Sequence, residues 1–255
     1  MEQDEMIEFR KIGALWYREM LRYWREKSRI ISSLILPLLW LLVFGGGMRT
    51  VQLPGVDNYQ VFIFPGIVGM TLLFTSVWSG ISVIWDREFG FLKEIMVAPI
   101  SRPSIVIGKA LGSGTGAFFQ GFILLLLSFV VGVTLSPLAF VILIPVMILI
   151  AIGLVCVGLF IASVINSMEG FNFIMSLVIM PMFFTSGALF PLSSSPEWLQ
   201  VVSFFNPLTY GIDLLRWATL HSTITALPVV CEFLILTGFA VIMITACSFT
   251  FSIKR

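Results

Sequence analysis

Long apolar runs, separated by short polar segments, dominate the residue pattern of this 255-residue chain. A helix needs about 20 apolar residues to cross about 30 Å of hydrocarbon. The runs do not alternate apolar with polar residues as membrane β-strands do, and backbone groups in lipid must pair within the structure, so we interpret them as helices. The pattern predicts an all-α integral membrane protein with six transmembrane helices, within residues 30–48, 61–85, 110–136, 137–168, 170–189 and 227–253.

Composition and charge placement agree with this interpretation. Hydrophobic residues make up 58% of the chain and charged residues 11%, against about 25% charged residues in soluble domains. Lys and Arg are enriched in cytoplasmic loops. All of them except Arg49 and Arg216 precede the first predicted span, follow the second or end the chain. We therefore expect both termini and residues 86–102 to be cytoplasmic.

Residues 1–29 are predicted to form an N-terminal cytoplasmic region, and residues 30–255 a six-helix transmembrane domain. Within residues 5–29 the pattern indicates an amphipathic helix at the membrane interface. Its apolar positions are Phe9, Ile12, Trp16, Met20 and Tyr23, and its cations are Lys11, Arg18, Arg22, Arg25 and Arg29. Such a helix serves either as a simple anchor or also as a contact for a cytoplasmic partner, and the sequence leaves both open.

Glycines at the start of the third span predict a close helix contact. Gly108, Gly112 and Gly116 are four residues apart, so they share one face and allow another helix to approach. The cluster from Gly112 to Gly116 is not followed by Gly-Lys-Ser/Thr and is not preceded by a strand, so it does not indicate a phosphate-binding loop. We expect this chain to bind no ATP by such a loop.

Residues 191–226 form an external segment with signals for two short helices. Ser195 precedes Pro196, and Asn206 precedes Pro207, which are favoured residues at helix starts. Neither helix is long enough to span. The segment is expected either to lie on the outer surface or to re-enter the membrane.

No group of residues indicates catalysis or a metal site. His221 is the only histidine and lies in the external segment, where it lacks the partners of a serine protease or a zinc enzyme. Glu232 is the one acid clearly inside a span, near its outer edge, whereas ion-coupled carriers keep ionisable groups at mid-membrane. A non-transporting membrane scaffold or immunity-type protein and an ion-coupled secondary carrier remain as alternatives to a transport subunit driven by another chain.

The segment at 86–102 is short, charged and wedged between apolar runs. Its mixed charges suit a docking surface, Gly90 permits a bend, and Pro99 stops a helix before the chain re-enters the membrane. The plainer interpretation is a charged turn that only fixes topology.

Three motifs carry a family resemblance: Asp86-Arg87-Glu88-Phe89-Gly90-Phe91-Leu92-Lys93-Glu94 leading to Ala98-Pro99, Ser186-Gly187-Ala188-Leu189-Phe190-Pro191, and Asn206-Pro207-Leu208-Thr209-Tyr210. With their order and spacing, the chain resembles the permease subunit of type 2 ABC exporters, the branch of daunorubicin-resistance permeases and nodulation or polysaccharide exporters. Many members have Thr in place of Phe91 and an acid in place of Lys93. These departures put individual contacts in doubt but not the coupling role.

The resemblance implies a half-transporter in a prokaryotic cell membrane. Two copies, or two related chains, would form the pathway, and two separate ATPase subunits would hold ATP and Mg. This chain would have no cofactor and no nucleic-acid partner, and its cargo would be a drug-like amphiphile, a lipid or a lipid-linked glycan. The coupling helix would comprise Asp86, Arg87, Glu88, Phe89, Gly90, Leu92, Lys93, Glu94, Ile95 and Pro99. Candidates to line the pathway are Phe62, Phe64, Phe74, Trp78, Phe183 and Phe184.

Overall fold

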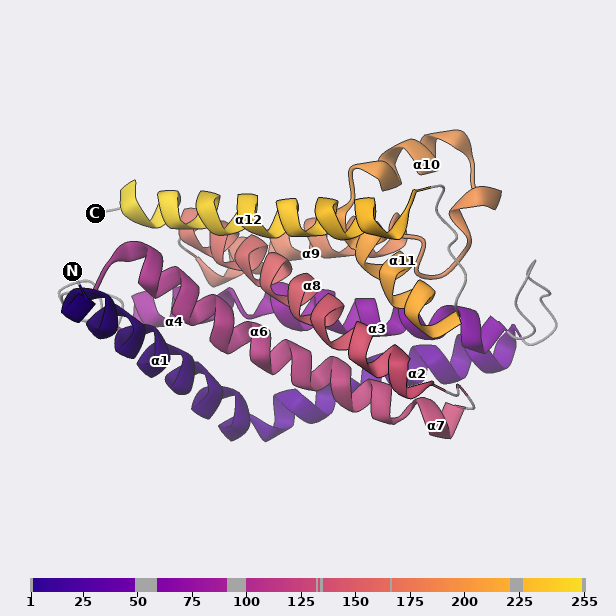
Figure 1. Cartoon of the computed structure of the whole chain (residues 1–255), viewed down its shortest axis with the longest axis horizontal. Helices are drawn as coiled ribbons and strands as arrows, with labels where there is room; N and C mark the ends of the chain where they lie inside the picture. The colour runs from indigo at the N-terminus through magenta and orange to yellow at the C-terminus, as the bar shows by residue number, and fades with distance from the viewer. Residues whose placement is uncertain are drawn as a thin grey trace.

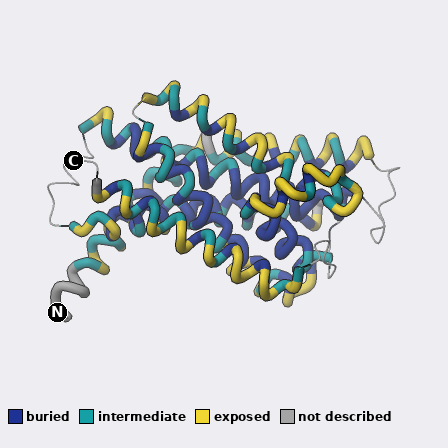
Figure 2. Tube along the Cα trace, turned by 90° about the horizontal axis from the view of Figure 1, so that it is seen from above, coloured by how far each residue is buried: buried dark blue, intermediate teal, exposed yellow. Residues whose placement is uncertain are grey.

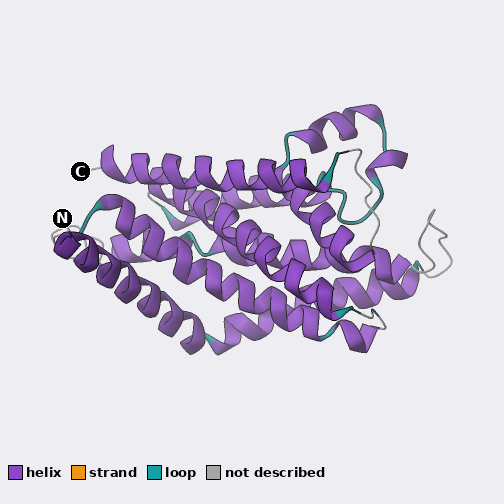
Figure 3. Cartoon of the chain, in the orientation of Figure 1, coloured by secondary structure: helices purple, strands orange, loops and turns teal. Residues whose placement is uncertain are grey.

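A computed structural model shows the chain as long helices that run side by side along one axis (Figure 1). The structure describes residues 2–48, 59–90, 100–131, 133, 135–165, 167–220 and 227–253. Every regular element in these ranges is a helix (Figure 3). The all-α class predicted from the sequence is confirmed.

The helices have two distinct ends. In chain order they are α1 (Glu2–Arg25), α2 (Lys27–Gly47), α3 (Tyr59–Trp78), α4 (Ile81–Glu88), α6 (Arg102–Leu126), α7 (Ser128–Val131), α8 (Pro137–Val164), α9 (Met168–Phe184), η1 (Leu192–Ser194), α10 (Glu197–Phe204), α11 (Pro207–Leu220) and α12 (Val229–Ile253). Both termini, α4 and the start of α6 lie at one end, which we call the terminal end (Figure 1). The other end, with α7, α10 and α11, is the far end.

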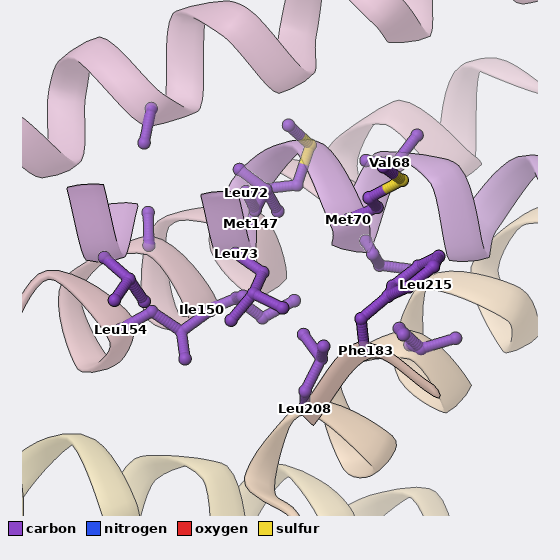
Figure 4. Packing of buried hydrophobic residues seen from close by; sticks show 14 of the residues in the cluster. Val68, Met70, Leu72, Leu73, Met147, Ile150, Leu154, Phe183, Leu208 and Leu215 are labelled. Carbon is purple, nitrogen blue, oxygen red and sulfur yellow. The ribbon is translucent and has the colours of Figure 1, made fainter. Parts of the chain in front are cut away.

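The core is built around α3 and α8. Helix α3 is buried along most of its length and packs against α2, α6, α8, α9 and α11. Figure 2 shows the buried residues concentrated inside the bundle and the exposed ones along its outer helices. The close-up in Figure 4 shows apolar side chains from four helices meeting there: Val68, Met70, Leu72, Leu73, Met147, Ile150, Leu154, Phe183, Leu208 and Leu215.

Four helical stretches in the described chain are long and apolar enough to cross a membrane: Ile30–Gly47, Tyr59–Glu88, Pro137–Val164 and Val229–Ser252. The protein is therefore a multi-pass membrane protein. The other two predicted spans are α6 and α9. Helix α9 is apolar but short, with 17 residues. Helix α6 is long enough, with 25 residues, but Lys109, Gln120 and several small residues make it less apolar.

The boundary between the third and fourth predicted spans falls where the sequence indicates. Pro137 is the first residue of α8, and the Ser136 hydroxyl accepts a hydrogen bond from the Ala139 amide at 3.1 Å. Both features suit a helix start.

Within residues 191–226, the two described helices differ in burial. Helix α10 is mostly exposed, with Leu199 and Ser203 buried. Helix α11 is buried along most of its length and packs against α3, α8 and α12. Residues 221–226, including His221, lie outside the described residues.

Candidate functional site

A buried ionic cluster joins three helices at the terminal end. Lys109 of α6 has no exposed surface, and its Nζ lies 2.5 Å from Asp86 Oδ2 and 3.3 Å from Glu19 Oε1. Asp86 lies in the last turns of α4, and Glu19 lies in α1. Arg18 Nη2 contacts Asp86 Oδ1 at 2.7 Å, and Arg22 Nη1 approaches the same oxygen at 3.7 Å. We call these five residues the ionic cluster.

The ionic cluster is costly to break, because its central charges are out of water. The side chains of Asp86 and Glu19 are only 4% and 5% exposed. Removing one partner of a buried ion pair strands the other charge, which costs about 3–5 kcal/mol. The carboxylates of Asp86 and Glu19 each face more than one cation, so α1, α4 and α6 are held as one unit.

A glycine face on α6 lets α1 come close enough to form the ionic cluster. A Cβ added at Gly112 would lie 2.5 Å from Glu19 Cβ, and one added at Gly108 would lie 2.8 Å from Leu15 Cβ. A Cβ at Gly116 would lie 2.9 Å from the Tyr23 ring. Steps of four residues match on the two helices, so α1 and α6 run in the same direction. The three glycines singled out in the sequence thus face α1.

The buried face of α1 overlaps only in part with the apolar face predicted from the sequence, since Met20 is buried and Tyr23 faces Gly116. Leu15, Glu19 and Met20 are buried, whereas Phe9 is 73% exposed and Trp16 38%. Glu19 is buried because it pairs with Lys109, a partner that helical periodicity does not reveal. The helix also ends at Arg25 rather than continuing to residue 29.

Glu8 fastens the beginning of α1 to the beginning of α6. Its carboxylate accepts hydrogen bonds from the Ser101 amide at 3.3 Å, from the Ser101 hydroxyl at 3.0 Å and from the Ser104 hydroxyl. A negative charge suits a helix N-terminus. The hydrogen bonds from Ser104 and Ser101 hold the pKa of Glu8 below its usual value of 4.5.

Two of the predicted coupling residues point into the protein. Asp86 belongs to the ionic cluster, and Arg87 donates hydrogen bonds to the carbonyls of Ile165 at 2.9 Å and Ala162 at 3.3 Å, at the end of α8. These residues therefore anchor the base of the segment, in contrast to the docking surface expected for them from the sequence.

The two residues that follow, Glu88 and Phe89, have side chains on the surface. Glu88 is exposed and Phe89 is 83% exposed. Gly90 has φ of 77°, a conformation in which a side chain would be strained, and it ends the helix. The remaining predicted coupling residues, Leu92, Lys93, Glu94, Ile95 and Pro99, lie outside the described residues.

The six candidate pathway residues fall into different environments. Phe62, Phe64 and Phe183 are at most 1% exposed and fill the core, with Phe62 lying 4.3 Å below the buried guanidinium of Arg216. Their side chains are packed within this copy of the chain. Phe184 is 44% exposed. Phe74 and Trp78 line a cavity of about 410 Å³.

The other two sequence motifs meet at the far end. Asn206 Nδ2 donates to the Met182 carbonyl at 2.6 Å, and its Oδ1 accepts from the Leu208 amide at 3.0 Å, which joins α9 to the start of α11. Arg216 Nη2 donates to the Gly187 carbonyl at 2.9 Å. Asn206 of the third motif, and Arg216 through Gly187 of the second motif, hold α11 in the bundle.

Sequence reasoning missed Lys109 as the partner of Asp86, and Glu19 as the second acid that pairs with Lys109. In the sequence, Lys109 served only as one of the cations that predict the cytoplasmic side of the membrane. Lys109 is, however, the last charged residue before the uncharged stretch 110–168, and it lies between Gly108 and Gly112. A charge beside a helix-packing face was the available signal that it is buried against another helix.

Known proteins resemble this chain over most of its length. A family model for ABC-2 type transporters matches residues 10–220. The transport permease ycf38 of Cyanophora paradoxa is 33% identical over 204 residues, 78% of this chain and 70% of that protein. Nodulation protein J of Rhizobium leguminosarum bv. viciae is 26% identical over 209 residues, 80% of each chain. The multidrug ABC transporter permease YbhR of Escherichia coli (strain K12) is 27% identical over 168 residues, 64% of this chain and 44% of that protein.

The family match includes α1 from Arg10 onward, the ionic cluster, the end of α4 and all of α11. It confirms the resemblance seen in the three motifs and favours neither a scaffold nor a secondary carrier. The chain belongs to the ABC-2 type transporter family, as the membrane permease subunit of an ABC exporter whose ATPase is a separate subunit.

Proposed function

We propose that this permease works as one of two copies in a prokaryotic cell membrane, with an ATPase subunit docked on each copy at the terminal end. The observation that carries the proposal is the end of α4. There the exposed Glu88 and Phe89 follow directly on Asp86 and Arg87, which are fixed to the rest of the protein.

The proposed topology has six crossings and a cytoplasmic terminal end. The crossings are α2, α3 with α4, α6, α8, α9 and α12. Helix α6 has 25 residues, which at about 1.5 Å per residue is long enough to cross the hydrocarbon. The orientation rests on Lys and Arg, which in this sequence gather in α1, around α4 and the start of α6, and at the C-terminus.

The proposed docking surface begins at Glu88 and Phe89 and continues through Leu92, Lys93, Glu94, Ile95 and Pro99. An exposed aromatic side chain such as Phe89 is a typical anchor for a pocket on a partner. Charges at the rim of such a contact mainly set the orientation of the partner and the rate of encounter.

The ionic cluster is proposed to transmit movement from this surface. Movement of the docking surface by the ATPase would displace Asp86, which forms ion pairs with Arg18 of α1 and Lys109 of α6. Arg87 would transmit the same movement to the end of α8 through its hydrogen bonds to the carbonyls of Ile165 and Ala162. The ATPase would thus move several helices together rather than α4 alone.

A pull-down of the ATPase subunit tests the docking surface. Phe89→Ala should weaken binding about tenfold or more, since burying an aromatic side chain contributes about 1.5–3 kcal/mol. Glu88→Arg should weaken it through repulsion of a like charge. Glu197→Arg, a matched change at an exposed glutamate of α10, should leave binding unchanged. Normal binding by both Phe89→Ala and Glu88→Arg would overturn the docking proposal.

The cargo and the pathway are proposed from two lines of support. The relatives are named for nodulation and for multidrug transport, which fits a drug-like amphiphile, a lipid or a lipid-linked glycan. Helices α2, α9 and α12 have large exposed apolar faces, and those of α2 and α9 would face the second copy or lipid. Their exposed residues include Leu39, Leu42, Val43, Phe173, Leu177 and Phe184.

A further inference from the structure

A cavity of about 410 Å³ lies between α2, α3, α4 and α6 within a single copy of the chain. We call it the α2–α4 pocket. Its volume is within the range of about 300–1,000 Å³ found for sites that hold small molecules. Its described lining comprises Ser32, Ser33, Leu36, Pro37, Met70, Thr71, Phe74, Thr75, Trp78, Ile81, Trp85 and Gln120.

The walls of the α2–α4 pocket are apolar and aromatic, with one polar strip. None of the described lining residues is ionisable. Taking a charged group out of water without a partner costs several kcal/mol or more. The pocket therefore favours an uncharged occupant, with its apolar body against Phe74, Trp78 and Trp85.

The polar strip is centred on Gln120, whose side chain is buried. Its Nε2 donates to the Ile30 carbonyl at 3.2 Å and to the Ser33 hydroxyl. Because a carbonyl only accepts, the amide nitrogen must be on this side. Its Oε1 then faces α3 and accepts from the Thr75 hydroxyl at 3.0 Å.

This arrangement sets the hydrogen-bonding preference of the strip. Both Nε2 hydrogens of Gln120 and the hydroxyl hydrogen of Thr75 are engaged within the protein. Oε1 of Gln120 and Oγ1 of Thr75 each keep capacity to accept a second bond. The complementary group on an occupant is thus a hydrogen-bond donor, such as a hydroxyl or an N–H.

The pocket also adjoins the ionic cluster. The guanidinium of Arg22 lies 4.9 Å from the centre of the Trp85 ring, and Trp85 lines the pocket. Thr75 lines both the pocket and a small cavity of about 30 Å³ that reaches Glu19 and Arg22. An occupant would therefore contact Trp85 of α4, and the residue that follows Trp85 is Asp86.

We propose that the α2–α4 pocket binds an uncharged, largely apolar molecule through one hydrogen-bond donor, and that this is where cargo first contacts the permease. The second part rests on the proposed export function. The binding part does not, because it follows from the lining of a single copy.

Three related fluorescent probes test the chemistry. N-phenyl-1-naphthylamine is uncharged and carries one N–H donor, its N-methyl derivative lacks the donor, and 8-anilinonaphthalene-1-sulfonate is anionic. Each is titrated into nanodiscs that contain the full permease without ATPase or ATP, and the signal of empty nanodiscs is subtracted. We expect saturable binding of the first probe, about tenfold weaker binding of the second, as the loss of one hydrogen bond predicts, and no saturable binding of the sulfonate.

Variants locate the bound probe. Leu36→Trp adds bulk at an exposed position that lines the pocket, and it should abolish saturable binding. Leu39→Trp is the matched control on the same helix, exposed but not among the lining residues, and it should bind as the natural chain does. Thr75→Val should reduce the tenfold preference for the probe that carries the donor.

Equal saturable binding of all three probes, or binding that survives Leu36→Trp, would overturn the proposed site. The site would also be overturned if none of the three probes bound saturably and cysteines placed at Leu36 of two copies formed a disulfide. The pocket would then be a groove that the second copy fills. Binding as expected, but with no effect of the probe on transport or ATP hydrolysis, would leave the site in place and remove its role in cargo uptake.

Discussion

Single residues decide how the terminal end is held together. Lys109 is fully buried yet charged, and this arrangement is stable because Asp86 and Glu19 approach it from two other helices. The sequence marks Asp86 as part of a motif, but its partner Arg18 is far away along the chain and comes close to it only in three dimensions. Residue patterns therefore predicted which segment matters, and could not predict which of its side chains point inward.

The ionic cluster predicts a strong dependence of stability on Lys109. Lys109→Met should lower the free energy of unfolding by about 3–5 kcal/mol, because Asp86 and Glu19 would remain buried with less compensation. Lys27→Met, at an exposed cation of α2, should change it by less than about 1 kcal/mol. Chemical unfolding of the purified permease in detergent measures both. Equal stability of the two variants would show that Lys109 is not in a tight buried pair.

At the scale of elements, the decisive contact is α1 against α6. Helical periodicity predicted that α1 forms and that three glycines on α6 accept a neighbour. It did not predict that α1 is that neighbour, since spacing alone carries no information about which helix fills a glycine face. The apolar periodicity of α1 also did not reveal Glu19 on its packed face, because Glu19 is buried there through its contact with Lys109.

Gly112→Ala should loosen α1. The added Cβ would lie 2.5 Å from Glu19 Cβ, so the helices must separate and the Glu19–Lys109 contact must lengthen. Gly114→Ala is the matched control on the same helix, since its Cβ would meet Ile152 at an ordinary 3.4 Å. Hydrogen exchange of the amides in residues 8–25 should quicken in the first variant and not in the second. Unchanged exchange in Gly112→Ala would mean that the glycine face does not set the contact.

At the scale of the whole molecule, the two ends have different constructions. The terminal end is tied by charges, whereas the far end is tied by hydrogen bonds from Asn206 and Arg216 to backbone carbonyls around α9. The all-helical class and the main helix boundaries follow from hydropathy, since apolar length and helix-start residues are local signals. Hydropathy could not predict the burial of α11, because Asp213 and Arg216 make its sequence polar. The structure shows that these two residues pair with each other.

The proposed orientation predicts which end reacts with an impermeant thiol reagent in intact cells. In a background with the exposed Cys231 replaced by Ser, a cysteine at Glu197 should be labelled and one at Phe89 should not. Both positions are exposed, so accessibility differs only by side of the membrane. Labelling at Phe89 and protection at Glu197 would reverse the topology.

Cargo-stimulated ATP hydrolysis in charge-swap variants tests the central claim, that movement passes from the ATPase through the ionic cluster. Asp86→Lys and Lys109→Asp each place like charges together. The double variant restores an opposite pair at these two positions, while the swapped charges still meet Arg18, Arg22 and Glu19, so its recovery should be partial. Each is assembled with the ATPase subunit, and binding and hydrolysis are measured separately. We predict that both single variants still bind the ATPase through Glu88 and Phe89 but lose at least tenfold in stimulation, and that the double variant regains part of it. Full stimulation in both single variants, with normal ATPase binding, would contradict the account.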